Sequence, residues 1–239
     1  MKVLTTEEMR RAEKLADAAG LSYTEMMERA GRAVALETAR RYPVWQRHVL
    51  ILVGPGNNGG DGLVAARYLH QTGAQVHACL WRNRPESDAN FRLVLERGIP
   101  VVTVESDESL STLRRLAGEA DIVVDALLGT GAVRPIEGSM KTMLDAVRDA
   151  AATRRYAPHV VAVDLPSGLN ADSGTIDSAA LRADLTVTFA FPKRGHYLFP
   201  GAAYVGELVV ADIGIPASTA DDVQLSVSDD PTVAALLPA

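Results

Sequence analysis

The chain contains a single cysteine, Cys79, which excludes an internal disulfide and any cysteine-rich metal site. Cys79 lies in the apolar run 76–81, where a buried and inert thiol is expected. No apolar run approaches the roughly 20 residues of a membrane span, and the first residues lead directly into a charged helical pattern without a signal peptide. Acidic residues outnumber basic ones, 30 to 24, and the net charge of −6 disfavours a nucleic-acid or membrane partner. We therefore expect a cytoplasmic protein.

Common catalytic signatures are also missing, because the chain has no Ser-His-Asp order, Cys–His pair or HExxH spacing. Among the five histidines, only His196 lies outside the predicted helices and strands. Hydrophobic residues make up 47% of the chain, which is enough to bury a full core. We find no repeat, low-complexity tract or inter-domain linker. The sequence predicts a single domain over residues 1–239, with the residues after about 230 forming a tail or linker.

Strand and helix patterns alternate along most of the chain, which predicts right-handed βαβ units, a mostly parallel sheet and the α/β fold class. Two helical patterns precede the first strand, within residues 5–41. Their apolar stripes predict helices that pack on the sheet, although a lid or partner-binding role stays open. The predicted strands are 48–53, 76–81, 100–104, 121–125, 159–164, 184–190 and 206–211, with 223–227 as a further candidate.

A glycine-rich loop follows the first predicted strand, at residues 54–62, and leads directly into a helical pattern. Glycines leave the backbone bare, so a ligand can approach it closely. Unpaired N–H groups at the start of a helix favour an anion. The side-chain amides of Asn57 and Asn58 could form turns, but they also suit oxygen ligation or recognition of an amide.

This loop differs from an ordinary dinucleotide-binding fingerprint in two respects. Asp61 stands at the expected helix start, where its charge would repel a pyrophosphate. It could instead be the N-cap of the helix. The second strand would normally end in an acidic residue that binds a ribose, but here it ends in Trp81 and Arg82, with Arg84 shortly after.

Two further strands end in a carboxylate that is followed by a glycine-containing loop, at Asp125 and Asp164. One such aspartate would ordinarily be a turn or cap residue. Together with Asn58 and Ser167, however, the two form an all-oxygen set that suits a hard cation. A carboxylate at the mouth of a buried strand can also have a raised pKa and transfer protons.

A fourth segment, residues 188–201, combines basic and aromatic residues with turn formers. Lys193 is its candidate contact for an anionic or aromatic ligand, and His196 is the one histidine to consider for chemistry. A purely structural loop held by Pro192 and Pro200 is the alternative.

Four ordered motifs together resemble the YjeF N-terminal domain family of NAD(P)H-hydrate epimerases. The motifs are GPGNNGGDG (54–62), VDALLGTG (124–131), VDLPSGLNADSG (163–174) and PKRGHYLFPG…GELVVADIGIP (192–216). The resemblance covers residues 4 to 216 approximately, so it is much more specific than the glycine pattern alone.

The resemblance implies a three-layer α/β/α Rossmann-like sandwich with a two-helix N-terminal preface. It implies interconversion of the R and S forms of hydrated NADH or NADPH at C6 of the nicotinamide ring. It also implies one potassium ion per subunit, bound by Asn58, Asp125 and Ser167. A partner dehydratase that depends on ADP or ATP would repair the S form, as a fused or a separate protein. The sequence leaves a homo-oligomer open.

Substrate contacts follow from the same motifs, with Lys193 added from its own segment. They are Asn57, Asn58, Gly59, Gly60, Asp61, Gly129, Thr130, Gly131, Arg134, Asp164 and Lys193. Because epimerisation at C6 needs a positioned acid/base group and no redox step, we assign proton transfer to Asp164. Two rival interpretations remain: a redox dehydrogenase, and a non-catalytic nucleotide-binding or scaffold module with the same fold.

Overall fold

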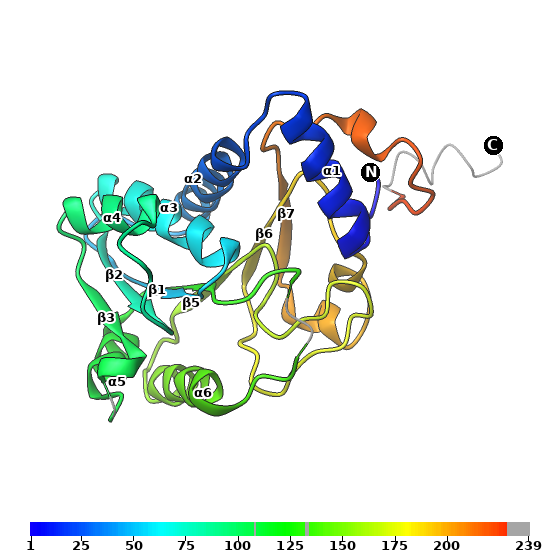
Figure 1. The fold of residues 1–239 in the computed structure, drawn as a ribbon. Helices are drawn as coiled ribbons and strands as arrows, with labels where there is room; N and C mark the ends of the chain where they lie inside the picture. Colours follow the sequence, from blue (N-terminus) through cyan, green and yellow to red (C-terminus); the bar gives the residue numbers. More distant parts are fainter. Residues whose placement is uncertain (108, 132–133, 229–239) are drawn as a thin grey trace.

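A computed structural model describes residues 1–107, 109–131 and 134–228. Within them, seven parallel strands form one sheet in the order β3-β2-β1-β4-β5-β6-β7 (Figure 1). The strands are β1 (His48–Val53), β2 (Gln75–Leu80), β3 (Val101–Thr103), β4 (Ile122–Ala126), β5 (His159–Val163), β6 (Leu185–Phe189) and β7 (Glu207–Ala211). All seven main strand predictions are confirmed to within one residue at each end.

Helices cover both faces of this sheet, so the predicted α/β/α sandwich is confirmed. The α-helices are α1 (Thr6–Ala18), α2 (Tyr23–Arg41), α3 (Asn57–Gln71), α4 (Ala89–Glu96), α5 (Ser111–Glu119) and α6 (Gly138–Ala152). The short 3-10 helices are η1 (Val104–Ser106), η2 (Arg194–His196), η3 (Gly201–Tyr204) and η4 (Ala217–Ala220). In Figure 1, α2, α3 and α4 lie on one side of the sheet, and α5 and α6 lie on the other.

Strand β1 shows how the sequence builds two cores at once. Its residues are apolar without a break because both faces of a parallel sheet are covered. Val49, Ile51 and Val53 pack into the core beneath α2 and α3. Leu50 and Leu52 point the other way, into the core beneath α5 and α6, as the two-residue period of a strand requires.

The sheet reverses its direction of growth beside β1. The chain adds β2 and then β3 on one side of β1, and returns to place β4 on the other side. The helices that follow β1 and β4, α3 and α6, therefore lie on opposite faces of the sheet. Ligands of open α/β sheets bind at such a point.

The candidate strand 223–227 is wrong, because this segment pairs with the start of the chain and lies outside the sheet. Ser226 forms one isolated antiparallel bridge with Lys2, and the Val3 N–H donates to the Leu225 carbonyl at 3.0 Å. Val223 is buried in the core that also holds α1. The alternating apolar pattern that suggested a strand reflects this packing. The tail predicted after about residue 230 lies outside the described residues.

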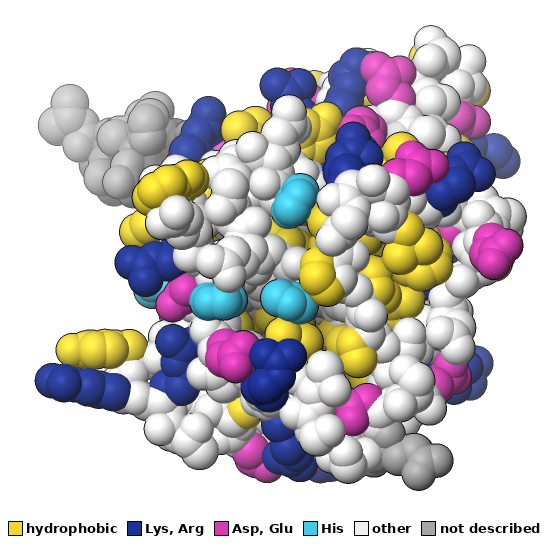
Figure 2. Space-filling model, turned by 90° about the vertical axis from the view of Figure 1, so that its left-hand side faces the viewer, with side chains coloured by type: hydrophobic (Ala, Val, Ile, Leu, Met, Phe, Trp, Pro, Cys, Tyr) yellow, Lys and Arg dark blue, Asp and Glu magenta, His cyan; other side chains and the backbone are white. Residues whose placement is uncertain are grey.

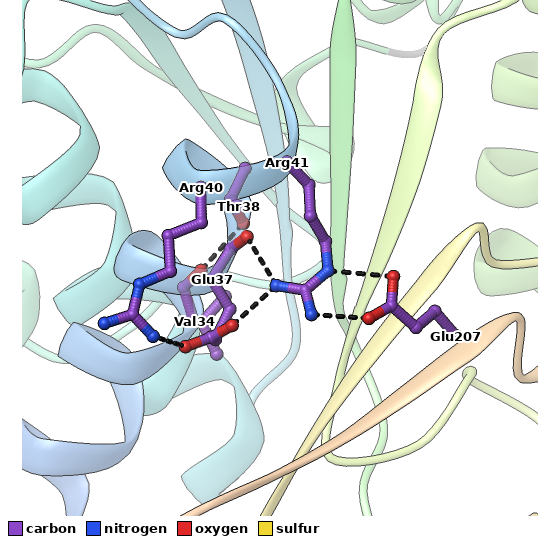
Figure 3. A network of polar contacts seen from close by, with 6 residues as sticks. All are labelled: Val34, Glu37, Thr38, Arg40, Arg41 and Glu207. Carbon is purple, nitrogen blue, oxygen red and sulfur yellow. Dashed lines mark hydrogen bonds and ion pairs between the residues drawn. The ribbon is translucent and has the colours of Figure 1, made fainter.

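A charged clamp joins α2 to the outermost strand β7 (Figure 3). The Arg41 guanidinium donates to both carboxylate oxygens of Glu207, at 2.9 and 2.5 Å, and to a Glu37 oxygen at 2.5 Å. Bidentate arginine–carboxylate pairs fix geometry better than single contacts do. The clamp thus fixes the edge strand to the helical layer.

Charged groups of both signs are mixed over the face of the molecule shown in Figure 2, with hydrophobic groups between them. In the described ranges, no helix is long and apolar enough to cross a membrane.

Candidate functional site

The Asn-Gly segment after β1 is helical, and this rules out the helix-cap alternative for Asp61. Helix α3 begins at Asn57, and its N-cap is Gly56, which supplies no side-chain hydrogen bond. Asp61 is the fifth residue of the helix and therefore does not cap it. The first N–H groups of α3 consequently have no capping side chain, and Asn57 is exposed beside them.

Most glycines of this motif are required by the protein's own packing and not by ligand access. A Cβ atom on Gly54 would lie 1.8 Å from the Leu127 carbonyl oxygen, and one on Gly59 would lie 2.0 Å from the Gly54 carbonyl oxygen. A Cβ on Gly60 would lie 2.7 Å from the sulfur of Met27. Gly56 is different, because a Cβ there would meet no atom within 4 Å. Backbone open to a ligand is thus found at Gly56.

Replacing Gly54 with alanine should destabilise the fold by about 3 kcal/mol or more, because the added methyl group collides with rigid backbone. Gly56→Ala is the matched control, since its backbone is extended (φ −94°, ψ −164°) and the added methyl group meets open space. Thermal or urea unfolding would compare the two variants. Equal stability of both would contradict the close contact at Gly54.

Arg84 holds the loop between β1 and α3 in place, a role that the sequence did not reveal. Its Nη1 donates to the carbonyl oxygens of Gly54 and Gly56, at 2.6 and 3.3 Å. Its Nε donates to Asp88 at 2.5 Å, which orients the guanidinium. Arg84 therefore occupies the region where a dinucleotide-binding protein would present an acid, and binds backbone there.

Asp125 and Ser167, two of the predicted cation ligands, form one buried unit. The Ser167 hydroxyl donates to Asp125 Oδ1 at 2.6 Å, and the Ser167 N–H donates to Asp125 Oδ2 at 2.8 Å. The Leu127 N–H donates to Asp125 Oδ1 at 3.3 Å. Burial raises the pKa of Asp125 despite these hydrogen bonds. In the described ranges this carboxylate forms no ion pair with a basic side chain.

Asn58, the third predicted ligand, reaches the loop after β4. A Cβ on Gly129 would lie 3.2 Å from Asn58 Oδ1, and the buried Asn58 Nδ2 has no hydrogen-bond partner among the described residues. The chemistry of the three side chains is that of a hard-cation site. All of the candidate ligand atoms are oxygens, and each retains a free lone pair: Asn58 Oδ1, Asp125 Oδ2 and Ser167 Oγ.

Asp164 and Lys193 form a buried ion pair at the carboxyl ends of β5 and β6. Lys193 Nζ lies 2.6 Å from Asp164 Oδ1, and the Thr188 hydroxyl donates to the same oxygen at 2.8 Å. Burial opposes ionisation of Asp164, but the charge of Lys193 together with the hydrogen bonds from Lys193 and Thr188 lowers the pKa of Asp164. Asp164 Oδ2 has no hydrogen-bond partner in the described part of the chain, and the side chain is 12% exposed. An ionised carboxylate with one free oxygen is suited to accept a proton.

His196 fixes the backbone of Asp164 and is not a titrating group at neutral pH. The Lys193 N–H donates to His196 Nδ1 at 3.0 Å, so Nε2 carries the proton and donates to the Asp164 carbonyl oxygen at 2.9 Å. Burial, with the nearby Lys193 charge, lowers the pKa of His196 to about 4. Asp164 has a left-handed backbone (φ 65°), which is uncommon for a residue other than glycine and is found at functional sites.

Two more carboxyl groups lie close enough to Asp164 for its charge to raise their pKa. Burial raises the pKa of Asp61 well above its usual value, and the charges of Asp164 and Glu13 raise it further. Burial likewise raises the pKa of Glu13, although Lys193 opposes the shift. Glu13 belongs to α1 and was not predicted as a site residue. Its position four residues after the buried Met9, on the buried face of the helix, was the available signal.

Asp61→Asn should stabilise the protein at neutral pH. Because the pKa of Asp61 is raised in the folded state, the contribution of this group to folding stability is fully present below its unfolded pKa of about 3.9. That contribution is lost as pH rises through the folded pKa. Each unit of that difference corresponds to about 1.4 kcal/mol. Unfolding of both proteins by urea between pH 4 and 8 should show the variant gaining over the wild type as pH rises. A constant difference would show that Asp61 has an ordinary pKa.

The remaining predicted site residues lie in the loop after β4. Thr130 is partly buried beside Gly129, whereas Gly131 and Arg134 are exposed and line a cavity described below.

Cys79 is buried, and burial raises its pKa to about 12, as expected for an inert thiol. Of the two N-terminal helices, α2 packs on the sheet at β6 and β7, as predicted, and also against α3, whereas α1 brings Glu13 towards the site.

Comparison with known proteins identifies similar chains. The profile of the family described as "YjeF-related protein N-terminus" matches residues 23–195. A "Bifunctional NAD(P)H-hydrate repair enzyme" of Thermofilum pendens is 37% identical over 238 residues, which cover 97% of this chain and 44% of that protein. An "NAD(P)H-hydrate epimerase" of Limosilactobacillus fermentum is 37% identical over 194 residues, which cover 81% of this chain and 87% of that protein. The chain thus spans less than half of the bifunctional relative and most of the epimerase.

A solved structure shares the fold. The crystal structure of the yeast protein ynu0 has a TM-score of 0.75 and 22% sequence identity, with 96% of this chain and 97% of the yeast chain covered. At this identity the likeness concerns the fold.

Proposed function

Because the chain belongs to the YjeF-related N-terminal family, we propose that it interconverts the R and S forms of hydrated NADH and NADPH at C6 of the nicotinamide ring. Similarity to proteins named NAD(P)H-hydrate epimerase, over most of their length, supports this activity. The observation that carries the proposal is the Asp164–Lys193 pair, which places an ionised carboxylate with a free oxygen at the carboxyl edge of the sheet.

The chemistry requires proton transfer and no change of oxidation state. C6 of the hydrate bears a hydroxyl group and is bonded to the ring nitrogen. Its configuration is lost when either the bond to the hydroxyl or the bond to the nitrogen breaks, and it is reset when that bond reforms on the other face. Because Asp164 is ionised, Asp164 Oδ2 would take the proton of the C6 hydroxyl and pass it to the ring nitrogen as the C6–N bond breaks to leave an aldehyde, and would move it back as the ring closes on the other face, while Lys193 keeps the carboxylate charged between turnovers.

Asn58, Asp125 and Ser167 would hold a potassium ion beside this centre. When bound, the ion would supply positive charge near the substrate and compensate the Asp125 carboxylate. The chain's own residues orient the ligands: the Leu128 N–H donates to Ser167 Oγ at 2.9 Å, and the Ser167 N–H holds Asp125.

A direct test follows the two hydrates by chiral-resolving chromatography. Purified R hydrate should convert to the equilibrium mixture of R and S much faster with the protein than without it. Unchanged conversion would reject the function and favour a non-catalytic module. Reduction or oxidation of a nicotinamide cofactor with an added substrate would favour a dehydrogenase.

Potassium chloride should raise the melting temperature by about 3–5 °C when the ion is present at about ten times its Kd, because binding to the folded state alone contributes about 1.4 kcal/mol. Tetramethylammonium chloride at equal ionic strength is the matched control, and Asp125→Asn should remove the difference. An identical shift with both salts would contradict a potassium site.

Partnership with an NAD(P)H-hydrate dehydratase is part of the proposal. Relatives named as bifunctional repair enzymes are more than twice as long as the region that they share with this chain. The S hydrate produced at this site would pass to such an ADP- or ATP-dependent activity, fused or separate.

A further inference from the structure

A cavity lies at the carboxyl edge of the sheet, next to the site described above. It has a volume of about 300 Å³ and is lined by Trp81 after β2, by the loop that follows β4, and by the start of α6. Leu128, Ile136 and Met140 make its walls mainly apolar. Gly131 in the lining is two residues from Gly129, which contacts Asn58. The cavity and the proposed catalytic site therefore share one loop.

Trp81 gives this cavity a rigid aromatic wall. Its indole Nε1 donates to the Ser139 hydroxyl at 3.0 Å, which ties the ring to the first turn of α6. The Arg82 guanidinium lies over the indole ring, with its Cζ 4.3 Å from the ring centroid. A flat aromatic wall among aliphatic side chains is suited to a heteroaromatic ring.

Arg82 is exposed and makes no ion pair with a described acidic side chain. The neighbouring Asn83 binds Glu105 through its amide at 3.1 Å, and Arg84 is committed to Asp88 and the glycine loop. Arg82 is thus an arginine of the β2 loop that is free to meet an anion. Stacking holds Arg82 on the ring of Trp81, which lines the cavity, without using its N–H groups.

The order of the strands places three candidate contacts along one edge of the sheet. Trp81 follows β2 and Asp164 follows β5, and the sheet order β2-β1-β4-β5 separates these strands by three intervals, or about 14 Å. The uncapped N-terminus of α3, with the open Gly56, lies at the end of β1 between them. A molecule with an aromatic ring at each end and a pyrophosphate in the middle has groups for all three places.

We propose that the Trp81 cavity binds the adenosine end of the substrate and that Arg82 binds a phosphate on its 2′-oxygen, so that the hydrate of NADPH is preferred over that of NADH. This inference rests on the proposed function for the identity of the substrate. An arginine near the end of the second strand is the residue that accommodates a 2′-phosphate in dinucleotide-binding sheets, whereas an acid there binds a free 2′-hydroxyl. Glu137, also in the lining, provides an acceptor for the adenine amino group.

The binding test needs no epimerase activity. The chain has two tryptophans, and Trp45 is 68% exposed and distant in sequence from the cavity, so Trp45→Phe leaves Trp81 as the sole indole reporter. In this background, adenosine 2′,5′-bisphosphate should quench Trp81 fluorescence and bind about 10–100-fold more tightly than 5′-AMP. Arg82→Gln should remove this difference and leave the affinity for 5′-AMP nearly unchanged.

Arg40→Gln is the matched control, because it removes the same charge from an exposed arginine on α2, across the sheet from α6. It should leave both affinities unchanged. Equal weakening of both nucleotides by Arg82→Gln, or no quenching by either, would overturn the inference.

The kinetic test separates this inference from the proposed function. With active protein, Arg82→Gln should raise KM for the NADPH hydrate about 10–100-fold, with kcat and both constants for the NADH hydrate little changed. Activity without any preference between the hydrates rejects the Arg82 inference alone. Nucleotide discrimination at Trp81 without epimerisation rejects the proposed function alone.

Discussion

Asp164→Asn is expected to slow epimerisation by about a hundred- to ten-thousand-fold, which is the usual contribution of a general acid/base. Asparagine tolerates the left-handed backbone of this position, so the local chain path should persist. The substitution removes the proton-accepting oxygen and leaves Lys193 buried without its anion. Loss of activity should therefore be accompanied by loss of stability.

The double variant Asp164→Asn/Lys193→Met separates these two effects. It removes both charges, so stability should return towards that of the wild type, while the rate stays as low as in Asp164→Asn. Chromatography of the R and S hydrates and urea unfolding would measure the two quantities. Recovery of rate in the double variant would show that Asp164 acts only through folding.

Lys193→Met should cost about 3–5 kcal/mol of folding stability, because it leaves a carboxylate buried without its cation. Lys193 holds the pKa of Asp164 below its usual value, so the stability that the pair provides is full above about pH 4 and is lost as pH falls further. The deficit of the variant should therefore shrink in acid. Lys14→Met, at an exposed lysine of α1, is the control and should change stability by less than about 0.5 kcal/mol.

Urea unfolding at pH 7 and at pH 3.5 would give both differences for Lys193→Met. If the variant is as stable as the wild type at pH 7, the ion pair contributes nothing to folding and the cost of burying Asp164 is met elsewhere.

Local patterns predicted most of the sheet, because each strand is a short apolar run that is buried on both faces. Residues 48–53 and 122–126 are the clearest cases. The same local reading failed where a distant contact decided the structure. Asn57 to Gly60 are poor helix formers, yet they form the first turn of α3. Their glycines are there because only glycine fits against the Gly54 carbonyl and Met27.

In the candidate site, too, some residues could be predicted from local sequence and others depend on distant contacts. Asp125 and Asp164 could be found because each ends a predicted strand, and the carboxyl ends of parallel strands meet at one edge. Glu13 lies 151 residues from Asp164 in the sequence, and no local signal links them. The pairing of Asp164 with Lys193 and the backbone hydrogen bond from His196 also depend on how β5 and β6 are placed, which spacing alone does not specify.

The first residues of the chain bear on when the site can form during synthesis. The Leu4 N–H donates to the Pro192 carbonyl at 2.9 Å, and the Arg194 N–H donates to the Leu4 carbonyl at 3.2 Å, so the two ends of this contact flank Lys193. A ribosome translates nearly 190 further residues before Leu4 can meet its partner. Long-range contacts of this kind close late because of the entropy of the intervening loop. Strands β1 to β5 can therefore assemble on the nascent chain well before Lys193 is in place.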